Sequence, residues 1–267
     1  MKFSRVNKDE FGFDIDELDE ENIDDNSYKL IKFGLSDVEL KLKSMSSSIQ
    51  SSILKDYSEL SAKMLDLILG MSSSNFQKKP PADLDKINLL LSRLGKESIN
   101  QDTLSKSIVE SKDSEESKLL SFFLNELLNS QNKHSAQEAS IENFIKIINS
   151  YLTISSEEKF LKFDKAKFSV SIYNSIVNEN LNWNSLSSGE KQVVSIFSKL
   201  LLEEQKDNLI IIDEPELSLS IEWQRKFLPD IVKADSCKQL IAITHSPFIF
   251  DNDLDQFAKS IKVDIEK

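Results

Sequence analysis

The sequence predicts an α/β protein that combines a small parallel sheet with a large helical subdomain. Apolar residues recur at three-, four- and seven-residue steps through residues 37–69, the spacing of a long helix with one apolar stripe. Short apolar runs at 209–212 and 239–244 enclose a helical pattern at 221–234. Strand, helix and strand in that order predict a βαβ unit, in which the two strands run parallel.

Three regions follow one another along the chain. We expect an acidic N-terminal segment over 1–34, a helical insertion or arm over 35–152, and a lobe with the parallel sheet over 153–267. Residues 9–25 are rich in Asp and Glu and contain no Lys or Arg. Such a run is typical of a solvated segment, and the alternative is an acidic arm that docks on a basic partner.

The helical region contains further periodic segments after the first helix. We expect helices at 82–94, 114–128 and 136–152, with polar sequence around His134 on the surface between the last two. Gly70 is a plausible C-cap of the first helix, because glycine readily adopts the left-handed conformation found there. The region forms either a packed helical core or an arm that binds a partner.

The pattern changes to strands and turns after residue 155. Alternating apolar residues at 160–163 and 168–172 predict two strands of a hairpin, and residues 178–184 predict a turn. The run at 209–212 has the composition of a strand covered on both faces. Pro229 is expected to kink or divide the helix in which it lies.

Composition excludes several classes of protein. At 267 residues the chain is long enough for a sizeable core, and its net charge of −12 disfavours direct binding to nucleic acid or to an anionic membrane. No apolar run approaches the roughly 20 residues of a membrane helix. Cys237 is the single cysteine, which excludes an internal disulfide and fits a reducing cytoplasm.

Residue types suited to phosphate chemistry occur at the ends of the two predicted parallel strands. The first strand runs directly into Asp213 and Glu214, and the second ends at His245. A carboxylate at a strand end can hold Mg²⁺ through oxygen contacts, and a second carboxylate can act as a general base. An imidazole can donate a hydrogen bond to a phosphate group, and the alternative for His245 is a helix cap near Ser246.

A third group of residues precedes the helix that starts near residue 188. Ser187, Ser188, Gly189 and Glu190 stand where loop N–H groups and the positive end of a helix dipole point outward. Such an arrangement can bind an anion, and Gly189 permits close backbone approach. The alternative is an ordinary N-cap formed by Ser187 or Ser188.

Taken together, residues 186–192 (LSSGEKQ), 209–215 (LIIIDEP) and 243–247 (ITHSP) resemble the signature, Walker B and switch-histidine motifs of ABC-type ATPases. The form DEPELSLS at 213–220 is similar to SMC-like, RecF-like and overcoming-lysogenization-type ATPases, which act in DNA repair and anti-phage defence. Two departures are visible: Ser188 replaces a common glycine, and Ser220 stands where transporters place an aspartate.

The resemblance implies an ATPase lobe with ATP and Mg²⁺ as cofactors. In such a lobe Glu214 polarises the attacking water, Asp213 holds the metal, and His245 senses the γ-phosphate. The loop at 187–190 would contact the nucleotide of the opposing subunit in a head-to-head dimer.

The phosphate-cradling motif G-x-x-x-x-G-K-[ST] does not occur in this sequence. A truncated gene, a split ATPase completed by a second chain, or a degenerate binding subunit would each explain this. In the first two cases the strand at 209–212 and the helix after Gly189 should expose apolar surface where the P-loop lobe packs.

Two functions therefore remain open from the sequence. The first is an ATPase lobe that hydrolyses ATP once a Walker A-bearing lobe or chain completes its site, and that drives a nuclease or another effector acting on nucleic acid. The second is an inactive interaction module that holds partner proteins through the helical region.

Overall fold

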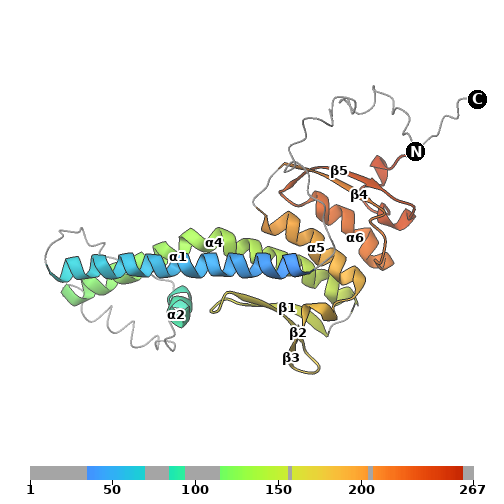
Figure 1. Ribbon diagram of the computed structural model, residues 1–267. Helices are drawn as coiled ribbons and strands as arrows, with labels where there is room; N and C mark the ends of the chain where they lie inside the picture. The colour runs from blue at the N-terminus through green and yellow to red at the C-terminus, as the bar shows by residue number, and fades with distance from the viewer. Residues whose placement is uncertain (1–34, 70–83, 94–114, 156–157, 204–206, 261–267) are drawn as a thin grey trace, which may run out of the picture. The chain divides into compact units, whose positions relative to one another are not determined.

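The computed structural model describes residues 35–69, 84–93, 115–155, 158–203 and 207–260, which belong to one compact unit (Figure 1). The acidic segment 1–34, Gly70 and residues 94–114 lie outside the described residues. The helices are α1 (Ser36–Ile68), α2 (Leu84–Arg93), α4 (Glu115–Ser155), α5 (Ser188–Leu202) and α6 (Ile221–Val232). The strands are β1 (Lys159–Asp164), β2 (Ser169–Asn174), β3 (Glu179–Leu181), β4 (Asn208–Asp213) and β5 (Cys237–Ile243).

The structure contains both helices and sheets, and strands β4 and β5 form a small parallel sheet. This agrees with the expected α/β class. The predicted helix at 37–69 is confirmed as α1, which packs along α4. The buried residues of α1 come from the predicted apolar stripe or continue it: Val38, Leu42, Ile49, Ile53 and Leu60. Among the described helices, none is both long and apolar enough to cross a membrane.

Helix α4 is a single helix where the sequence predicted two. The polar residues between 129 and 135 contain neither Gly nor Pro, so nothing in the backbone interrupts the helix. His134 was predicted at the surface, and this is wrong: it is only 6% exposed, with its Nε2 atom 3.6 Å from the Asp56 carboxylate of α1. Ser130 also donates a hydrogen bond to Asp56, at 2.6 Å. Contacts with α1 therefore continue through the polar stretch.

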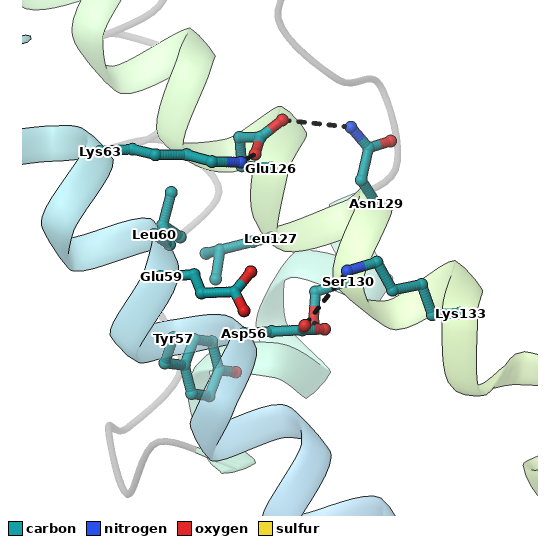
Figure 2. A pocket seen from close by; sticks show the side chains of 10 residues that line it. All are labelled: Asp56, Tyr57, Glu59, Leu60, Lys63, Glu126, Leu127, Asn129, Ser130 and Lys133. Carbon is teal, nitrogen blue, oxygen red and sulfur yellow. Dashed lines mark hydrogen bonds and ion pairs between the residues drawn. The ribbon is translucent and has the colours of Figure 1, made fainter.

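A cavity of about 210 Å³ lies beside this polar contact, between α1 and α4 (Figure 2). Its walls are largely charged or polar, and Lys63 bridges to Glu126 at 2.8 Å across one side. Lys133 approaches Asp56 at 3.1 Å on the other side. An apolar cluster of Leu60, Ile87, Leu124 and Leu127 joins α1, α2 and α4, and its residues Leu60 and Leu127 also line the cavity. The helical region thus has a core of its own.

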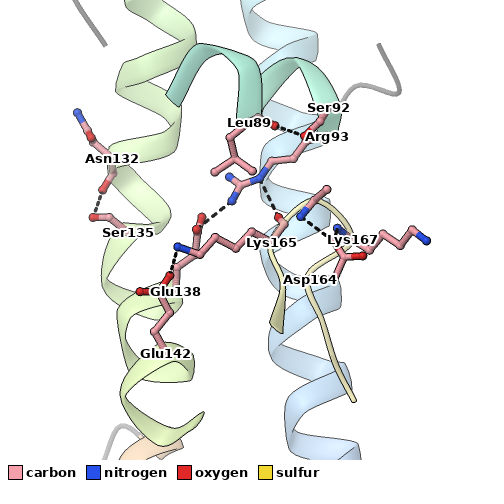
Figure 3. Close-up of polar contacts among 11 residues, drawn as sticks. Leu89, Ser92, Arg93, Asn132, Ser135, Glu138, Glu142, Asp164, Lys165 and Lys167 are labelled. Carbon is pink, nitrogen blue, oxygen red and sulfur yellow. Dashed lines mark hydrogen bonds and ion pairs between the residues drawn. The ribbon is translucent and has the colours of Figure 1, made fainter. Parts of the chain in front are cut away.

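Helix α2 is attached to the rest of this region through a buried arginine (Figure 3). The guanidinium of Arg93 contacts Glu138 of α4 at 2.9 Å, and the two side chains are only 1% and 10% exposed. Its Nε donates to the carbonyl of Lys165 in the β1–β2 turn at 3.2 Å, and its charge lies 4.2 Å from the ring centre of Phe168. One side chain therefore links α2, α4 and the hairpin.

The predicted hairpin is confirmed as β1 and β2, which pair antiparallel. The turn predicted at 178–184 is wrong in part, because residues 179–181 form β3 and pair with β2. The strand is short and carries only one apolar residue, Leu181, so alternation could not reveal it. The tight turn before it has Asn178 at a φ of 57°, a conformation that asparagine tolerates.

Aromatic packing joins the end of α4 to the helices of the predicted lobe. The ring of Tyr151 lies 5.7 Å from Phe197 of α5 and 5.5 Å from Trp223 of α6. Phe197 in turn contacts Phe227 of α6 at 6.0 Å. The Tyr151 hydroxyl donates to Asp230 at 2.9 Å, and burial together with this carboxylate raises the pKa of Tyr151. The domain boundary at 152/153 stays a prediction, and α4 continues through it.

The predicted βαβ unit is confirmed: β4 and β5 pair in parallel with α6 between them in the chain. Pro229 neither divides α6 nor ends it at once, because the helix continues to Val232. The prediction that β4 is covered on both faces is wrong. Leu209 and Ile211 are 50% and 66% exposed, and Ile241 and Ile243 on the same face of β5 are 36% and 44% exposed. Helix α6 packs against β5 and covers one face only.

Candidate functional site

The candidate site begins with the loop before α5. Ser187 is the N-cap: its hydroxyl accepts from the Glu190 N–H at 3.3 Å, and the Glu190 carboxylate accepts from the Ser187 N–H at 2.6 Å. This reciprocal capping box satisfies two donors at the helix start. The serines at 187 and 188 remain exposed, so their hydroxyls and the positive end of the helix can still be approached from solvent.

Glu190 itself points inward. Its side chain is 3% exposed, and Lys159 of β1 contacts both of its carboxylate oxygens, at 2.8 and 3.0 Å. A buried carboxylate needs such a partner, because burial of an unpaired charge is costly. The predicted contact between Glu190 and a nucleotide stays a prediction. Within the protein this residue connects the loop of Ser187 to the β1 strand, a connection that no local sequence pattern revealed.

The strand ends bring the acidic pair and the histidine together. Asp213 is the register partner of Ile243, and the Glu214 N–H donates to the Ile243 carbonyl at 2.8 Å. Glu214 has a φ of 48°, which is uncommon for a residue other than glycine. Its N–H extends the parallel pairing by one residue, and the left-handed conformation of Glu214 then bends the backbone into the turn at 215–218. Glu214 and His245 thus follow directly from two hydrogen-bonded strands.

A second glutamate fastens the two strand-end loops to each other. Glu216 accepts from the His245 N–H at 2.8 Å and from the Thr244 hydroxyl at 2.6 Å. The sequence interpretation missed Glu216, since its partners lie in the loop after β5, 28 and 29 residues further along the chain. Only the form DEPE, with an acid two residues beyond the pair, could have drawn attention to it.

His245 is exposed, and the cap at this point is supplied by its neighbour. The Ser246 hydroxyl accepts from the Phe248 N–H at 3.3 Å at the start of a short 3₁₀ helix, η3 (Pro247–Ile249). The alternative reading of His245 as a helix cap is therefore wrong. Ser246 also donates to Gln224 of α6 at 2.6 Å, and Gln224 donates to the Leu219 carbonyl at 3.0 Å.

The first turn of α5 reaches the loop after β4 through a close backbone contact. A Cβ atom at Gly189 would lie 2.2 Å from the carbonyl oxygen of Ser218, so only glycine fits at this position. Ser218 itself has a φ of 63°, a conformation that is uncommon for residues other than glycine. Gln192, one turn further into α5, donates to the Pro215 carbonyl at 3.3 Å. All three motif segments thus belong to one connected structure.

The residues present suit part of a nucleotide site. Asp213 is exposed at the strand end, and among the described residues no group of three or more His, Cys, Asp or Glu could hold a metal ion. Magnesium is commonly bound by one or two carboxylates together with substrate phosphates and water, so a lone aspartate is compatible with it.

The sequence predicted that the strand at 209–212 and the helix after Gly189 would expose apolar surface if the P-loop lobe is missing. This is confirmed for the strand, where Leu209 and Ile211 are exposed. It is wrong for α5, which is almost wholly buried.

Comparison with known proteins gives one family assignment. No curated protein matches the sequence. A family model described as an AAA domain, putative AbiEii toxin of a type IV toxin–antitoxin system, matches residues 22–251. The match covers most of the chain, spans both the helical region and the three motif segments, and supports an ABC/AAA-type ATPase group. The chain therefore belongs to this AAA-domain family.

Proposed function

We propose that the chain supplies the signature loop, the Walker B acids and the switch histidine of an ATP-hydrolysing site, and that a P-loop comes from another lobe or chain. The observation that supports this most strongly is the physical connection of the three segments. Glu214 bonds to the strand that ends before His245, and Gly189 lies against the carbonyl of Ser218. Motif-like sequences that matched by chance would not be expected to meet in this way.

The proposed roles follow from the chemistry of each group. Asp213 contributes an oxygen ligand to Mg²⁺, which neutralises phosphate charge when it is bound. Glu214 orients water and accepts its proton, an effect that contributes typically ~10²–10⁴-fold to the rate. His245 donates a hydrogen bond to the terminal phosphate. The exposed serines at the start of α5 and its N-terminal dipole bind the phosphates of the nucleotide held by the opposing subunit in a head-to-head dimer.

The uncovered face of the β4–β5 sheet is the proposed docking site of the P-loop lobe. The exposed side chains of Leu209, Ile211, Ile241 and Ile243 form one apolar strip, and Asp213 lies on the same face at its end. Fully burying an exposed side chain of this size contributes roughly 1.5–3 kcal/mol, and each of these partly exposed side chains would contribute a fraction of that. A lobe on this face would therefore gain apolar burial and bring its phosphate cradle next to the proposed metal ligand.

The family description suggests a biological setting. We propose that the chain acts in the cytoplasm as the ATPase of a toxin–antitoxin or defence system, and the membership in a family described as putative AbiEii toxins supports this setting. We further propose that closure of the dimer drives an effector that acts on nucleic acid, such as a nuclease, in DNA repair or anti-phage defence.

The second candidate is an interaction module built on the helical region. Helix α1 exposes large apolar side chains along its length, among them Leu40, Leu54 and Leu65, which a partner protein could cover. This function needs no nucleotide.

Isothermal titration calorimetry with ATP and Mg²⁺ separates the two functions. We expect no strong binding to the chain alone, and strong binding once a P-loop-bearing lobe of the same family is added. The Glu214→Gln variant keeps ATP from being consumed during the titration. Strong binding by the chain alone would contradict the incomplete site, and an absence of binding in both samples would favour the interaction module.

A further inference from the structure

We propose that Glu216 is a positioning residue: its carboxylate holds the loop 244–246 so that His245 stays beside the Glu214 turn. Its effect on turnover depends on the proposed ATPase function, whereas its effect on His245 does not. Glu216 has no role in the sequence interpretation, and it lies two residues beyond the proposed base.

Both carboxylate oxygens of Glu216 are used, and each takes a donor from the other strand-end loop. Oε1 accepts from the backbone N–H of His245 at 2.8 Å, and Oε2 accepts from the Thr244 hydroxyl at 2.6 Å. The same hydroxyl accepts from the Ser246 N–H at 3.0 Å. The carboxylate therefore fixes the main chain on both sides of the histidine.

The backbone that carries Glu216 is itself held. The Leu219 N–H donates to the Glu216 carbonyl at 3.1 Å, and the Leu217 N–H donates to the Glu214 carbonyl at 3.2 Å. The loop 214–219 also contacts α5: Gln192 donates to the Pro215 carbonyl, and Gly189 lies against the Ser218 carbonyl. Because the backbone of Glu216 is anchored, its side chain can hold the loop 244–246 in place and does not simply move along with that loop.

The charge of Glu216 strengthens the link. Burial alone would raise the pKa of Glu216, but the hydrogen bonds from the Thr244 hydroxyl and from backbone N–H groups outweigh it and lower the pKa below its ordinary value. The carboxylate is therefore ionised at neutral pH. Hydrogen bonds to an ionised acceptor are shorter and roughly twice as strong as neutral ones.

The position of His245 depends on the hydrogen bond between its main-chain N–H and Glu216. Within the described part of the chain the ring makes no hydrogen bond, and the residue is exposed. The position of the ring is thus set by its own main chain, and the N–H of that main chain is bound by Glu216. Loss of the carboxylate should release the histidine while the strand pairing of β4 and β5 remains.

Nuclear magnetic resonance tests the link without any nucleotide. The chain has two histidines, so selective ¹⁵N-histidine labelling gives two backbone amide signals, and the His245→Asn variant assigns them. Glu216→Gln replaces two acceptor oxygens by one and removes the charge. We expect the His245 amide signal to move upfield in this variant, because its strong acceptor is lost, while the His134 signal stays in place.

Two further variants make the result interpretable. Glu222→Gln removes an exposed acid in the first turn of α6 and should leave both histidine signals unchanged. Thr244→Val removes one of the two donors to Glu216 and should move the His245 signal less than Glu216→Gln does. Should Glu216→Gln fail to fold, this smaller change decides the question. An unmoved His245 signal in the folded variants would overturn the proposal.

Turnover gives the second readout once a P-loop-bearing lobe is present. We expect Glu216→Gln to lower kcat by about 10–100-fold with little change in KM, the usual loss when a residue supporting a catalytic group is removed. A moved His245 signal without any hydrolysis in the wild-type mixture would uphold the positioning role and count against the ATPase. Normal kcat in Glu216→Gln, together with an unmoved signal, would remove the positioning role and leave the ATPase intact.

Discussion

The helix pair α1–α4 and the loops that follow β4 and β5 are held together by different interactions. The helix pair buries apolar side chains at helical spacing, and the polar contacts of Asp56 with α4, and of Arg93 of α2 with α4, are added to that packing. The strand-end loops are held mainly by hydrogen bonds between residues far apart in the sequence, on a sheet with one uncovered face. The first region therefore gains stability from its own core, whereas the second is preorganised for contact with something else.

The largest expected effect lies where the end of α4 packs against α5 and α6, beyond the strand-end loops. Phe197 is fully buried between Tyr151 of α4 and Phe227 of α6. Phe197→Ala should lower the free energy of unfolding by about 3–5 kcal/mol, since it removes apolar contacts and leaves a cavity. Chemical denaturation measures this. Leu54→Ala on the exposed face of α1 is the matched control and should change stability by less than about 0.5 kcal/mol.

The next effect tests whether the buried ion pair of Arg93 and Glu138 contributes to the free energy of unfolding. Arg93→Met should cost up to about 3–5 kcal/mol, because Glu138 would remain buried without its partner. The double variant with Glu138→Leu should recover most of the loss. Hydrogen exchange of α2 would report its release in the single variant. Equal losses in the single and double variants would mean that the contacts of the guanidinium with the Lys165 carbonyl and the Phe168 ring, and not the ion pair with Glu138, hold α2.

A smaller effect concerns the contact between the loops. Gly189→Ala places a Cβ atom where the Ser218 carbonyl lies, so the loop after β4 must shift, at a cost of about 1–3 kcal/mol. Ser188→Ala, at the neighbouring exposed position, should be close to neutral. Denaturation compares the two. A neutral Gly189→Ala would show that the loop can move aside freely, which would weaken the contrast between a preorganised site and a flexible one.

The smallest effect is the dependence of the helix pair on pH. Burial opposes ionisation of Asp56, but hydrogen bonds from Ser130 and Lys133 and the nearby positive charges lower the pKa of Asp56. Its contribution to stability is then fully present above its ordinary pKa and is lost as the pH falls through the lowered value. Asp56→Asn should cost less than about 1 kcal/mol at neutral pH, since Lys133 is exposed, and nothing in strong acid. An equal cost at both pH values would contradict this.

The sequence predicted those elements that follow from the spacing of apolar residues and from the sequence of strands and helices along the chain. Residues 37–69, the hairpin and the βαβ unit all follow from apolar spacing, and each formed as expected. The continuity of α4 and the burial of His134 were missed, because they depend on Asp56 of another helix.

The same limit applies to the candidate site. Ser187, Asp213, Glu214 and His245 stand out from local motifs, and the structure places them in connected loops. The partners Lys159 and Glu216 were not found, since each acts on a segment far away in the sequence. Their roles arise only when strands and helices have been brought together. The nucleotide roles of all these residues stay predictions.

ATP hydrolysis by the chain mixed with a P-loop-bearing lobe tests the proposed site most directly. The comparison is between the wild-type chain, Glu214→Gln and the exposed control Glu222→Gln. We predict hydrolysis only in the mixture, a loss of ~10²–10⁴-fold in Glu214→Gln, and wild-type turnover in Glu222→Gln. Undiminished hydrolysis by the mixture that contains Glu214→Gln would contradict the assignment of the strand-end acids to an ATPase site.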